Sequence, residues 1–419
     1  MSSLLTYLLE YNRYCNIIGI GVVIALAALF SEHRRKIQIK LVCNALLMQF
    51  AIAWFALKTQ WGKATLAGMA HTVSYLYAYA ETGVAFVFGN LVNTVETPWG
   101  TVFAIKILPL IVFFGAFMSL LFYCGIVQRV VAAIEMLIRP ILGTSGPETT
   151  CAIANSFLGQ TESPLLIRNY LAQMTRSEML VVMLSGMGTI TAAILVVFVS
   201  MGVPVESLLT ASVMAIPATI MIAKILIPET EKQKYDYEAQ QYTSKASNVF
   251  DAISAGTSDG LYLALNVGAM LIAFIALMSM VNGLLSGTCE YINYWFNVNM
   301  PICTIDYICS KLFYPFAVLL GFTGTEASQV AQLLGIKVGV NEFLAYYKMV
   351  SMNLSARTIA VTSFALCGFS NFSCIGIQVG GISILAPEKR VMLTQLGVYA
   401  VLGAALSNLL TAMIASLFL

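Results

Sequence analysis

Long apolar runs fill most of the sequence, and short polar segments separate them. A membrane-spanning helix needs about 20 mainly apolar residues, and about eight of the runs approach this length. They lie near residues 14–31, 40–57, 103–125, 178–201, 207–227, 260–286, 358–385 and 393–418. Because only helices and closed barrels satisfy the backbone inside lipid, runs of this length predict an all-α polytopic membrane protein.

Three further segments carry apolar and polar residues in an amphipathic pattern. They are residues 62–98, 127–142 and 235–255. Such a pattern is typical of helices that lie in the plane of a membrane surface. We therefore expect these segments to be interfacial and not to span.

Two segments, 147–177 and 309–346, each contain two short apolar arms around a small or polar tip. Arms of this length are too short to cross a bilayer, so the pattern predicts re-entrant hairpins. Each is followed by a long apolar run that small and polar residues interrupt, Ser185–Thr191 in the first and Gly368–Gly376 in the second. Paired hairpins and broken helices are typical of inverted-repeat transporters, which bind substrate near the membrane midplane.

The composition supports contact with lipid. The chain has 419 residues, of which 59% are hydrophobic and 10% charged, whereas soluble proteins carry about 25% charged residues. The net charge of +2 gives no indication of nucleic-acid binding. No small-residue cleavage site follows the apolar run Tyr14–Phe30, so we expect a retained first membrane helix and not a signal peptide.

The basic residues predict the orientation. Lysines and arginines follow the first, third and fifth predicted spans and precede the last one, and the loop 287–308 has none. The positive-inside rule then places the basic loops in the cytoplasm and both termini outside. Lys58 and Lys63, after the second span, are exceptions to this pattern.

Cysteine and histidine do not predict a metal site. The chain has nine cysteines and two histidines, and His33 and His71 are far apart. Most cysteines lie in or beside apolar segments, where cysteine behaves as a small hydrophobe. Cys289, Cys303 and Cys309 flank a polar loop, and either free thiols or one disulfide among them fits the sequence.

Two carboxylates lie where a charge is costly. Glu162, in Gly159–Pro164, and Glu342, in Asn341–Phe343, both belong to the predicted hairpins. Ionisable groups inside a membrane face a bundle interior or a water-filled cavity, and they mark substrate or ion paths. The paired acids therefore predict a carrier.

Polar and aromatic neighbours of these acids predict a small-molecule pocket. Gln160 and Thr161 precede Glu162, and Asn371 lies between Phe369 and Ser373 in the second broken run. Amide, hydroxyl and carboxylate groups beside an aromatic wall suit a small polar ligand. No basic cluster is available for an anion, so we expect a neutral ligand rich in hydroxyls or ring nitrogens. The alternative is that these polar groups hold helices together.

Asn155, Thr189 and Thr191 lie beside the predicted backbone breaks. Unwound carbonyls together with an amide and a hydroxyl make a site of hard oxygen donors, which suits Na⁺. The alternative is that Asn155 caps one arm of the hairpin.

An enzyme is not expected, because the sequence contains no Walker loop, nucleophile elbow or histidine-based acid–base pair. The remaining rivals are a carrier of another polar solute, such as an organic acid, a channel, and a membrane-embedded enzyme. The motifs around Glu162 and Glu342 contain no basic residue, which argues against anions.

Four motifs occur in order along the chain. They are Gly159-Gln-Thr-Glu-Ser-Pro164, Ala264-Leu-Asn-Val-Gly-Ala-Met-Leu271, Asn341-Glu-Phe343 and Gly368-Phe-Ser-Asn-Phe-Ser-Cys-Ile-Gly-Ile377. With the runs Phe86–Gly89 and Phe103–Pro109, the chain resembles the concentrative nucleoside transporter family, bacterial type. The likeness covers nearly the whole chain.

The resemblance implies a homotrimeric nucleoside symporter in the lipid of the bacterial inner membrane. It also implies an elevator-type mechanism, in which a transport domain moves against a fixed scaffold. Residues 1–126 and 247–308 would form the scaffold, and residues 127–246 and 309–419 the transport domain.

The resemblance further implies the binding residues. The nucleobase would meet Gln160, Thr161 and Glu162, with apolar contacts from Ile194 and Leu265. The ribose would meet Glu342, Asn371 and the residue at position 374, with an aromatic contact from Phe369. The coupling ion, Na⁺, would be held by the side chains of Asn155 and Thr189 and the carbonyls of Leu158 and Ile190.

Two departures from the family pattern stand out. Cys374 occupies a ribose-binding position that is commonly serine, and a thiol is a weaker hydrogen-bonding group than a hydroxyl. Ser373 is expected to point elsewhere if this segment is helical. The segment Thr189–Ala193 lacks the glycine that many relatives place there.

Some bacterial members of the family couple transport to H⁺ and not to Na⁺. The Gln-Thr-Glu motif with Asn155 and Thr189 favours Na⁺.

Overall fold

The computed structural model describes residues 2–92, 102–231, 246–297, 301 and 303–419. This described part of the chain is helical and contains no β-strand, which confirms the predicted all-α class. The α-helices are α1 (Ser2–Leu9), α2 (Arg13–Leu29), α3 (Ile39–Lys58), α4 (Gln60–Phe88), α5 (Phe103–Lys106), α6 (Leu108–Tyr123), α7 (Ile126–Leu142), α8 (Gly146–Ala154), α9 (Arg168–Leu171), α10 (Arg176–Gly188), α11 (Ala192–Ser200), α12 (Val205–Leu226), α13 (Val249–Phe296), α14 (Ile305–Leu312), α15 (Tyr314–Leu319), α16 (Gly324–Gly339), α17 (Glu342–Ser351), α18 (Ala356–Leu366), α19 (Ser373–Leu385) and α20 (Arg390–Phe418).

Within the described residues, seven helical segments are long and apolar enough to cross a membrane. They are Thr6–Leu29, Ile39–Lys58, Phe103–Tyr123, Arg176–Ser200, Val205–Leu226, Val249–Phe296 and Pro387–Phe418. The remaining predicted span, 358–385, is divided into α18 and α19, each of which is short by itself. A polytopic membrane fold is thus observed, with one predicted span interrupted.

Two hairpins, each followed by a broken helix, organise the fold. The first hairpin runs from α8 through a non-helical tip into the 3-10 helix η4 (Ser163–Ile167) and α9, and the second consists of α16 and α17. After the first hairpin, α10 ends at Gly188 and α11 begins at Ala192. After the second, α18 ends at Leu366 and α19 begins at Ser373. Both breaks lie where small and polar residues interrupt the apolar runs.

The second hairpin differs from the prediction of 309–346. Residues Ile305–Leu319 form two separate short helices, α14 and α15, and the hairpin arms are α16 and α17. The chain turns between α15 and α16 at Gly321, whose φ is +90°, a conformation that glycine adopts without strain. Small and polar residues follow this turn, and they form the first turns of α16 and not the tip of a hairpin.

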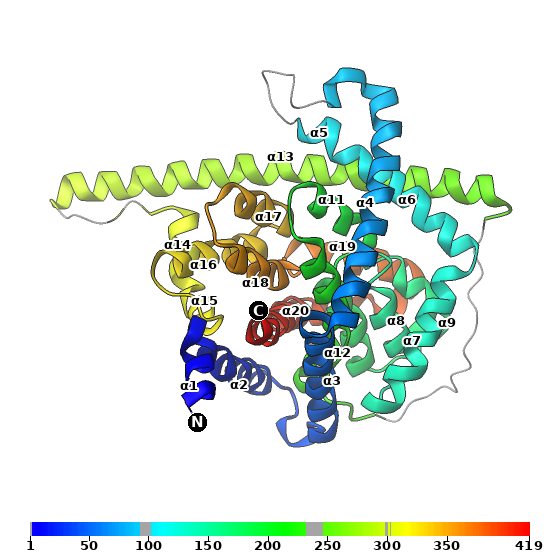
Figure 1. Cartoon of the computed structure of the whole chain (residues 1–419), viewed down its shortest axis with the longest axis horizontal. Helices are drawn as coiled ribbons and strands as arrows, with labels where there is room; N and C mark the ends of the chain where they lie inside the picture. The colour runs from blue at the N-terminus through cyan, green and yellow to red at the C-terminus, as the bar shows by residue number, and fades with distance from the viewer. Residues whose placement is uncertain (1, 93–101, 232–245, 298–300, 302) are drawn as a thin grey trace.

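The C-terminal helix α20 lies at the centre of the molecule (Figure 1) and packs against α2, α3, α10, α12, α18 and α19. The spans built from α10 with α11, from α12 and from α20 are mostly buried, whereas 22% and 11% of the apolar windows that contain α6 and α13 are buried. The two broken helices and α12 therefore surround α20 as one packed body, and α6 with α13 lies at its edge.

Helix α13 is the longest element, with 48 residues, and at 1.5 Å per residue it is about 72 Å long. It packs along α6, and the Ser119 hydroxyl donates a hydrogen bond of 2.8 Å to the Ala252 carbonyl. Figure 1 shows α13 extending beyond the rest of the molecule at both ends. The predicted interfacial helix 235–255 is wrong in its last part, because residues from Val249 onward are the first turns of α13; residues 232–245 lie outside the described residues.

The other two predicted amphipathic segments are helical. Residues 126–142 form α7, which buries Val127, Val131 and Leu142 on one face. Residues 60–88 form α4, and residues 93–98 of the predicted segment 62–98 lie outside the described residues.

The nine cysteines are all free, so no disulfide forms among Cys289, Cys303 and Cys309.

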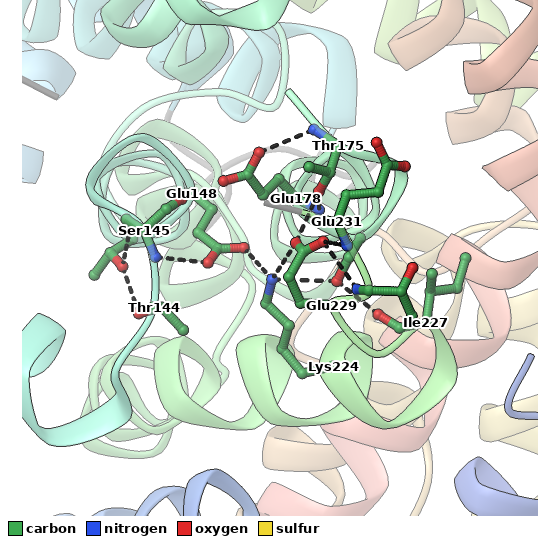
Figure 2. Close-up of polar contacts among 12 residues, drawn as sticks. Thr144, Ser145, Glu148, Thr175, Glu178, Lys224, Ile227, Glu229 and Glu231 are labelled. Carbon is green, nitrogen blue, oxygen red and sulfur yellow. Dashed lines mark hydrogen bonds and ion pairs between the residues drawn. The ribbon is translucent and has the colours of Figure 1, made fainter. Parts of the chain in front are cut away.

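A buried cluster of charges anchors the base of the first hairpin. Figure 2 shows Lys224 of α12 between Glu148 of α8 and Glu229, which follows α12. The Lys224 Nζ atom lies 2.7 Å from Glu148 Oε2 and 3.5 Å from Glu229 Oε2. It also donates to the Ser177 hydroxyl of α10 at 3.1 Å. The cluster therefore ties the hairpin, α10 and α12 together.

Replacing Lys224 with methionine is expected to lower the free energy of unfolding by about 3–5 kcal/mol, because it leaves the buried Glu148 carboxylate without its counter-charge. Denaturant unfolding of the purified protein in detergent would measure this. The double variant Lys224→Met, Glu148→Gln should recover much of the loss, and Lys40→Met, at an exposed position, should have little effect. Unchanged stability of Lys224→Met would show that the ion pair contributes nothing.

Candidate functional site

The tip of the second hairpin meets the second broken helix. Asn371 Nδ2 donates a hydrogen bond of 2.9 Å to Glu342 Oε2. The two side chains are 2% and 3% exposed, respectively. Glu342 is the first residue of α17, and Asn371 lies in the non-helical segment between α18 and α19. The fold therefore brings together the acid and the amide that the sequence singled out.

Two more groups fix the orientation of Asn371. The Ser373 hydroxyl donates to Asn371 Oδ1 at 2.6 Å, and the Cys374 backbone N–H donates to the same oxygen at 3.1 Å. Ser373 was expected to point elsewhere only if this segment is helical, and that condition is not met, because α19 begins only at Ser373 and the preceding residues are not helical. Ser373 supports Asn371 from the start of that helix.

Gln160, at the tip of the first hairpin, joins the same region through α19. Its Nε2 atom donates to the Cys374 thiol at 3.6 Å, and its Oε1 atom accepts a bond of 3.1 Å from Gln378 Nε2. Gln378 Nε2 also donates to the Met183 carbonyl of α10 at 3.0 Å. The two hairpin tips thus approach α19 at neighbouring turns.

The remaining predicted substrate residues occupy different surroundings. Phe369 and Ile194 are buried, and Thr161 packs over Gly381 of α19. Glu162 is exposed, and its carboxylate accepts a bond of 3.3 Å from the Gly159 N–H. Leu265 is 60% exposed on α13, and none of the contacts above involves it, so its role as a base contact stays a prediction.

The predicted ion-binding residues gather where the first hairpin meets the first broken helix. Asn155 Nδ2 donates to the Ser185 hydroxyl at 2.9 Å, and the Thr189 hydroxyl donates to the Asn155 carbonyl at 3.1 Å and the Ser185 carbonyl at 2.8 Å. The Ala192 N–H donates to the Phe157 carbonyl at 3.3 Å, which joins the hairpin tip to the start of α11. Asn155 and Thr189 are 2% and 1% exposed.

These residues fit a sodium ion. The Asn155 Oδ1 atom is buried and has no hydrogen-bond partner among the described residues, and a buried polar atom left in that state is costly. Leu158, three residues after Asn155, and Ile190, directly after Thr189, are both buried, and neither carbonyl accepts a backbone hydrogen bond from the described residues. Neutral oxygen donors of this kind suit Na⁺. No group of three or more His, Cys, Asp or Glu residues in the described chain could hold a different metal.

Sequence profiles identify the family. Residues 207–416 match the family described as "Na+ dependent nucleoside transporter C-terminus", and residues 18–91 match its N-terminus. Residues 104–205 match a domain named Gate and described as "Nucleoside recognition". The chain belongs to the Na⁺-dependent nucleoside transporter family. The family consists of transporters and not of enzymes, as the sequence predicted.

Individual members of this family align along almost the whole chain. The nucleoside permease NupC of Helicobacter pylori is 35% identical over 98% of this chain and 98% of its own. An uncharacterized transporter of Bacillus subtilis, YutK, is 40% identical over 97% of this chain and 100% of its own. A structure of CNTnw in an inward-facing substrate-bound state has a TM-score of 0.90 and 40% identity, covering 97% of each chain.

The sequence did not point to two residues of this candidate site. Gln378 is fully buried, and it follows Cys374 by one helical turn, so both lie on one face of α19. Ser185 precedes Thr189 by one turn at the end of α10. The signal for each was a polar residue one turn away from a predicted site residue.

Proposed function

We propose that this chain is a secondary active symporter that imports nucleosides across the bacterial inner membrane, driven by a Na⁺ gradient. The observation that carries this proposal is the buried hydrogen bond of 2.9 Å between Asn371 and Glu342, which joins the second hairpin to the second broken helix. A carboxylate accepts bonds from two hydroxyls, and an adjacent amide both donates and accepts. This pair suits the two neighbouring hydroxyls of a ribose.

Gln160 is proposed to recognise the nucleobase. Its amide group both donates and accepts, and the bonds to Cys374 and Gln378 hold it against α19. Thr161 and Glu162 at the same tip, Ile194 on α11 and Leu265 on α13 would complete the base contacts, and Phe369 would cover the sugar. Cys374 contributes a thiol that already accepts from Gln160, which weakens it as a ribose ligand.

The proposed ion site, between the first hairpin and the first break, would couple Na⁺ to substrate binding. When bound, Na⁺ would supply a positive charge at the unpartnered Asn155 Oδ1 atom. Asn155, Thr189 and the carbonyls of Leu158 and Ile190 would then hold the hairpin tip against α11. Gln160 belongs to that tip. Holding the tip against α11 would therefore hold Gln160 in the position in which it binds the base.

The transport movement is proposed to be of the elevator type. The packed body around α20 contains both broken helices. Together with both hairpins it would form the transport domain, residues 127–246 and 309–419. Helices α6 and α13 lie at its edge and belong to the scaffold, residues 1–126 and 247–308. Apolar side chains such as Tyr262, Ile272 and Leu284 are exposed along α13, which supports its contact with lipid and with partner copies in a homotrimer.

Uptake of uridine into proteoliposomes that contain the purified protein tests the proposal. We expect accumulation when an inward Na⁺ gradient is imposed and none with a K⁺ gradient. Accumulation driven only by H⁺ would support a nucleoside carrier and would refute the proposed sodium site. A channel would equilibrate uridine without accumulating it, and no uptake under any gradient would indicate a different solute.

A further inference from the structure

A second buried lysine has surroundings unlike those of Lys224. Lys337 lies on α16, the first arm of the second hairpin, and is 2% exposed. Its Nζ atom donates to the Ala365 carbonyl at 2.8 Å and to Asn408 Oδ1 at 2.6 Å. In the described part of the chain, no carboxylate lies within ion-pair distance of this ammonium. Both groups that hold the Lys337 charge are therefore neutral oxygens.

Neutral oxygens of this kind also hold alkali cations in proteins, whereas a structural ion pair contains a carboxylate. Lys224 faces carboxylates at 2.7 and 3.5 Å, whereas Lys337 is surrounded by a backbone carbonyl and a side-chain amide. Carbonyl and amide dipoles are the groups that unwound transmembrane helices direct at Na⁺. A charged side chain inside the membrane is costly, and such side chains usually have a function.

The ammonium of Lys337 lies at the break of the second broken helix. Ala365 belongs to the last turn of α18, and Asn408 Nδ2 donates to the Cys367 carbonyl just after that turn at 2.8 Å. The same Asn408 amide donates to the Gly188 carbonyl, at the end of α10, also at 2.8 Å. Asn408 of α20 thus joins the charge of Lys337 to the breaks of both helices.

The two breaks are in direct contact here. A Cβ atom on Gly368 would lie 2.6 Å from Asn408 Oδ1 and 2.9 Å from the Gly188 carbonyl oxygen, so only glycine fits. Several oxygens with negative partial charge converge at this point. The donors to these oxygens are the Asn408 amide, the Ser370 hydroxyl and Lys337, and Lys337 brings a positive charge among them.

The first half of the fold has a matching arrangement without a built-in charge. There the hairpin arm presents Asn155 to the last turn of α10, where the Ser185 and Thr189 hydroxyls lie. In the second half the corresponding arm presents Lys337 to the last turn of α18. The first set of oxygens includes an unpartnered Asn155 Oδ1 atom, and the second set is occupied by an ammonium.

We propose that Lys337 is a tethered cation that takes, in the second half of the fold, the place that a free ion takes in the first. The second broken helix is then held permanently in its bound form, and only the first half responds to an ion. This inference rests on the proposed symport, and it predicts that one free ion is transported with each nucleoside. Lys337 is a positioning residue, since it acts on Glu342 and Asn371 through the hairpin and the break.

Chemical rescue of a cavity variant tests this independently of transport. Lys337→Ala removes the charge and leaves space, so we expect its apparent melting temperature in detergent to fall by about 5 °C or more and to recover when propylammonium is added. Lys337→Met fills the same space without a charge, so it should be destabilised and show no recovery. As a matched control, Lys389 Nζ donates to the Met174 carbonyl from a partly buried position, and Lys389→Ala should not respond to the amine.

Two results would overturn the proposal. One is a Lys337→Met variant with the stability and the uridine affinity of the parent, since the charge would then be dispensable. The other is a Lys337→Ala variant that folds by size exclusion but gains nothing from propylammonium. If Lys337→Ala does not fold at all, the Lys337→Met comparison decides.

The ion count is measured on the parent protein. A Hill coefficient close to 1 for Na⁺ in uridine uptake is expected. A coefficient close to 2 would mean that a second free ion binds, and it would contradict the proposed role of Lys337. Failure of the parent to respond to Na⁺ would refute the proposed coupling ion, whereas the rescue by propylammonium would still report on Lys337. The two failures are therefore distinguishable.

Discussion

Replacing Glu342 with glutamine is expected to abolish nucleoside uptake while leaving the assembled protein intact. Hydrogen bonds to a charged acceptor contribute about 1.5–3 kcal/mol each, so losing two of them from ribose hydroxyls corresponds to about a hundredfold or more in affinity. Glutamine has nearly the same shape as glutamate, and its amide oxygen can still accept the bond from Asn371. The change therefore removes charge and acceptor capacity with little effect on packing.

Uridine binding by calorimetry and uptake into proteoliposomes would measure the effect. Glu326→Gln is a matched control on the same hairpin, because Glu326 lies in the first turn of α16, the other arm, and its Oε1 atom accepts a bond of 2.7 Å from the Thr358 hydroxyl. The two variants should elute alike on size exclusion. Near-normal transport by Glu342→Gln would contradict the role assigned to this carboxylate.

Replacing Asn155 with alanine is expected to raise the Na⁺ concentration needed for half-maximal uptake by about tenfold or more. The variant removes the unpartnered Oδ1 atom, and losing one direct ligand from a buried cation costs about as much as a charge-assisted hydrogen bond. At saturating Na⁺ the uridine affinity should approach that of the parent, because the ribose-binding pair is untouched. Uptake measured over a range of Na⁺ concentrations would separate these two effects.

Asn353→Ala provides the control for this variant, because Asn353 is exposed after α17. Loss of the Ser185 bond is controlled by Ser185→Ala, which removes that bond and leaves Asn155 Oδ1 in place. An Asn155→Ala protein with an unchanged Na⁺ dependence would remove Asn155 from the ion site. A shift in uridine affinity alone would assign it to the hairpin tip instead.

Local patterns predicted most of the fold because a bilayer imposes length and polarity on each segment. The apolar runs identified the spans, and the polar residues within them identified both breaks. The start of the second hairpin was missed, since the small and polar residues that follow the turn at Gly321 belong to the first turns of α16 and resemble a hairpin tip in sequence. The beginning of α13 was missed because a long helix can leave a surface and continue as a span without any change of local pattern.

By itself, the sequence determined the class, the family resemblance and the chemical types at the site. Glu342 and Asn371 are recognisable in an apolar sequence, because a polar group inside a membrane is costly and usually has a function. Their partnership at 2.9 Å was decided by the tertiary structure, which brings positions far apart in the chain into contact. The same holds for Lys337 and Asn408, 71 positions apart. In sequence Lys337 is an ordinary lysine in a short helix; only the packing of α16, α18 and α20 shows that its charge is buried among neutral oxygens.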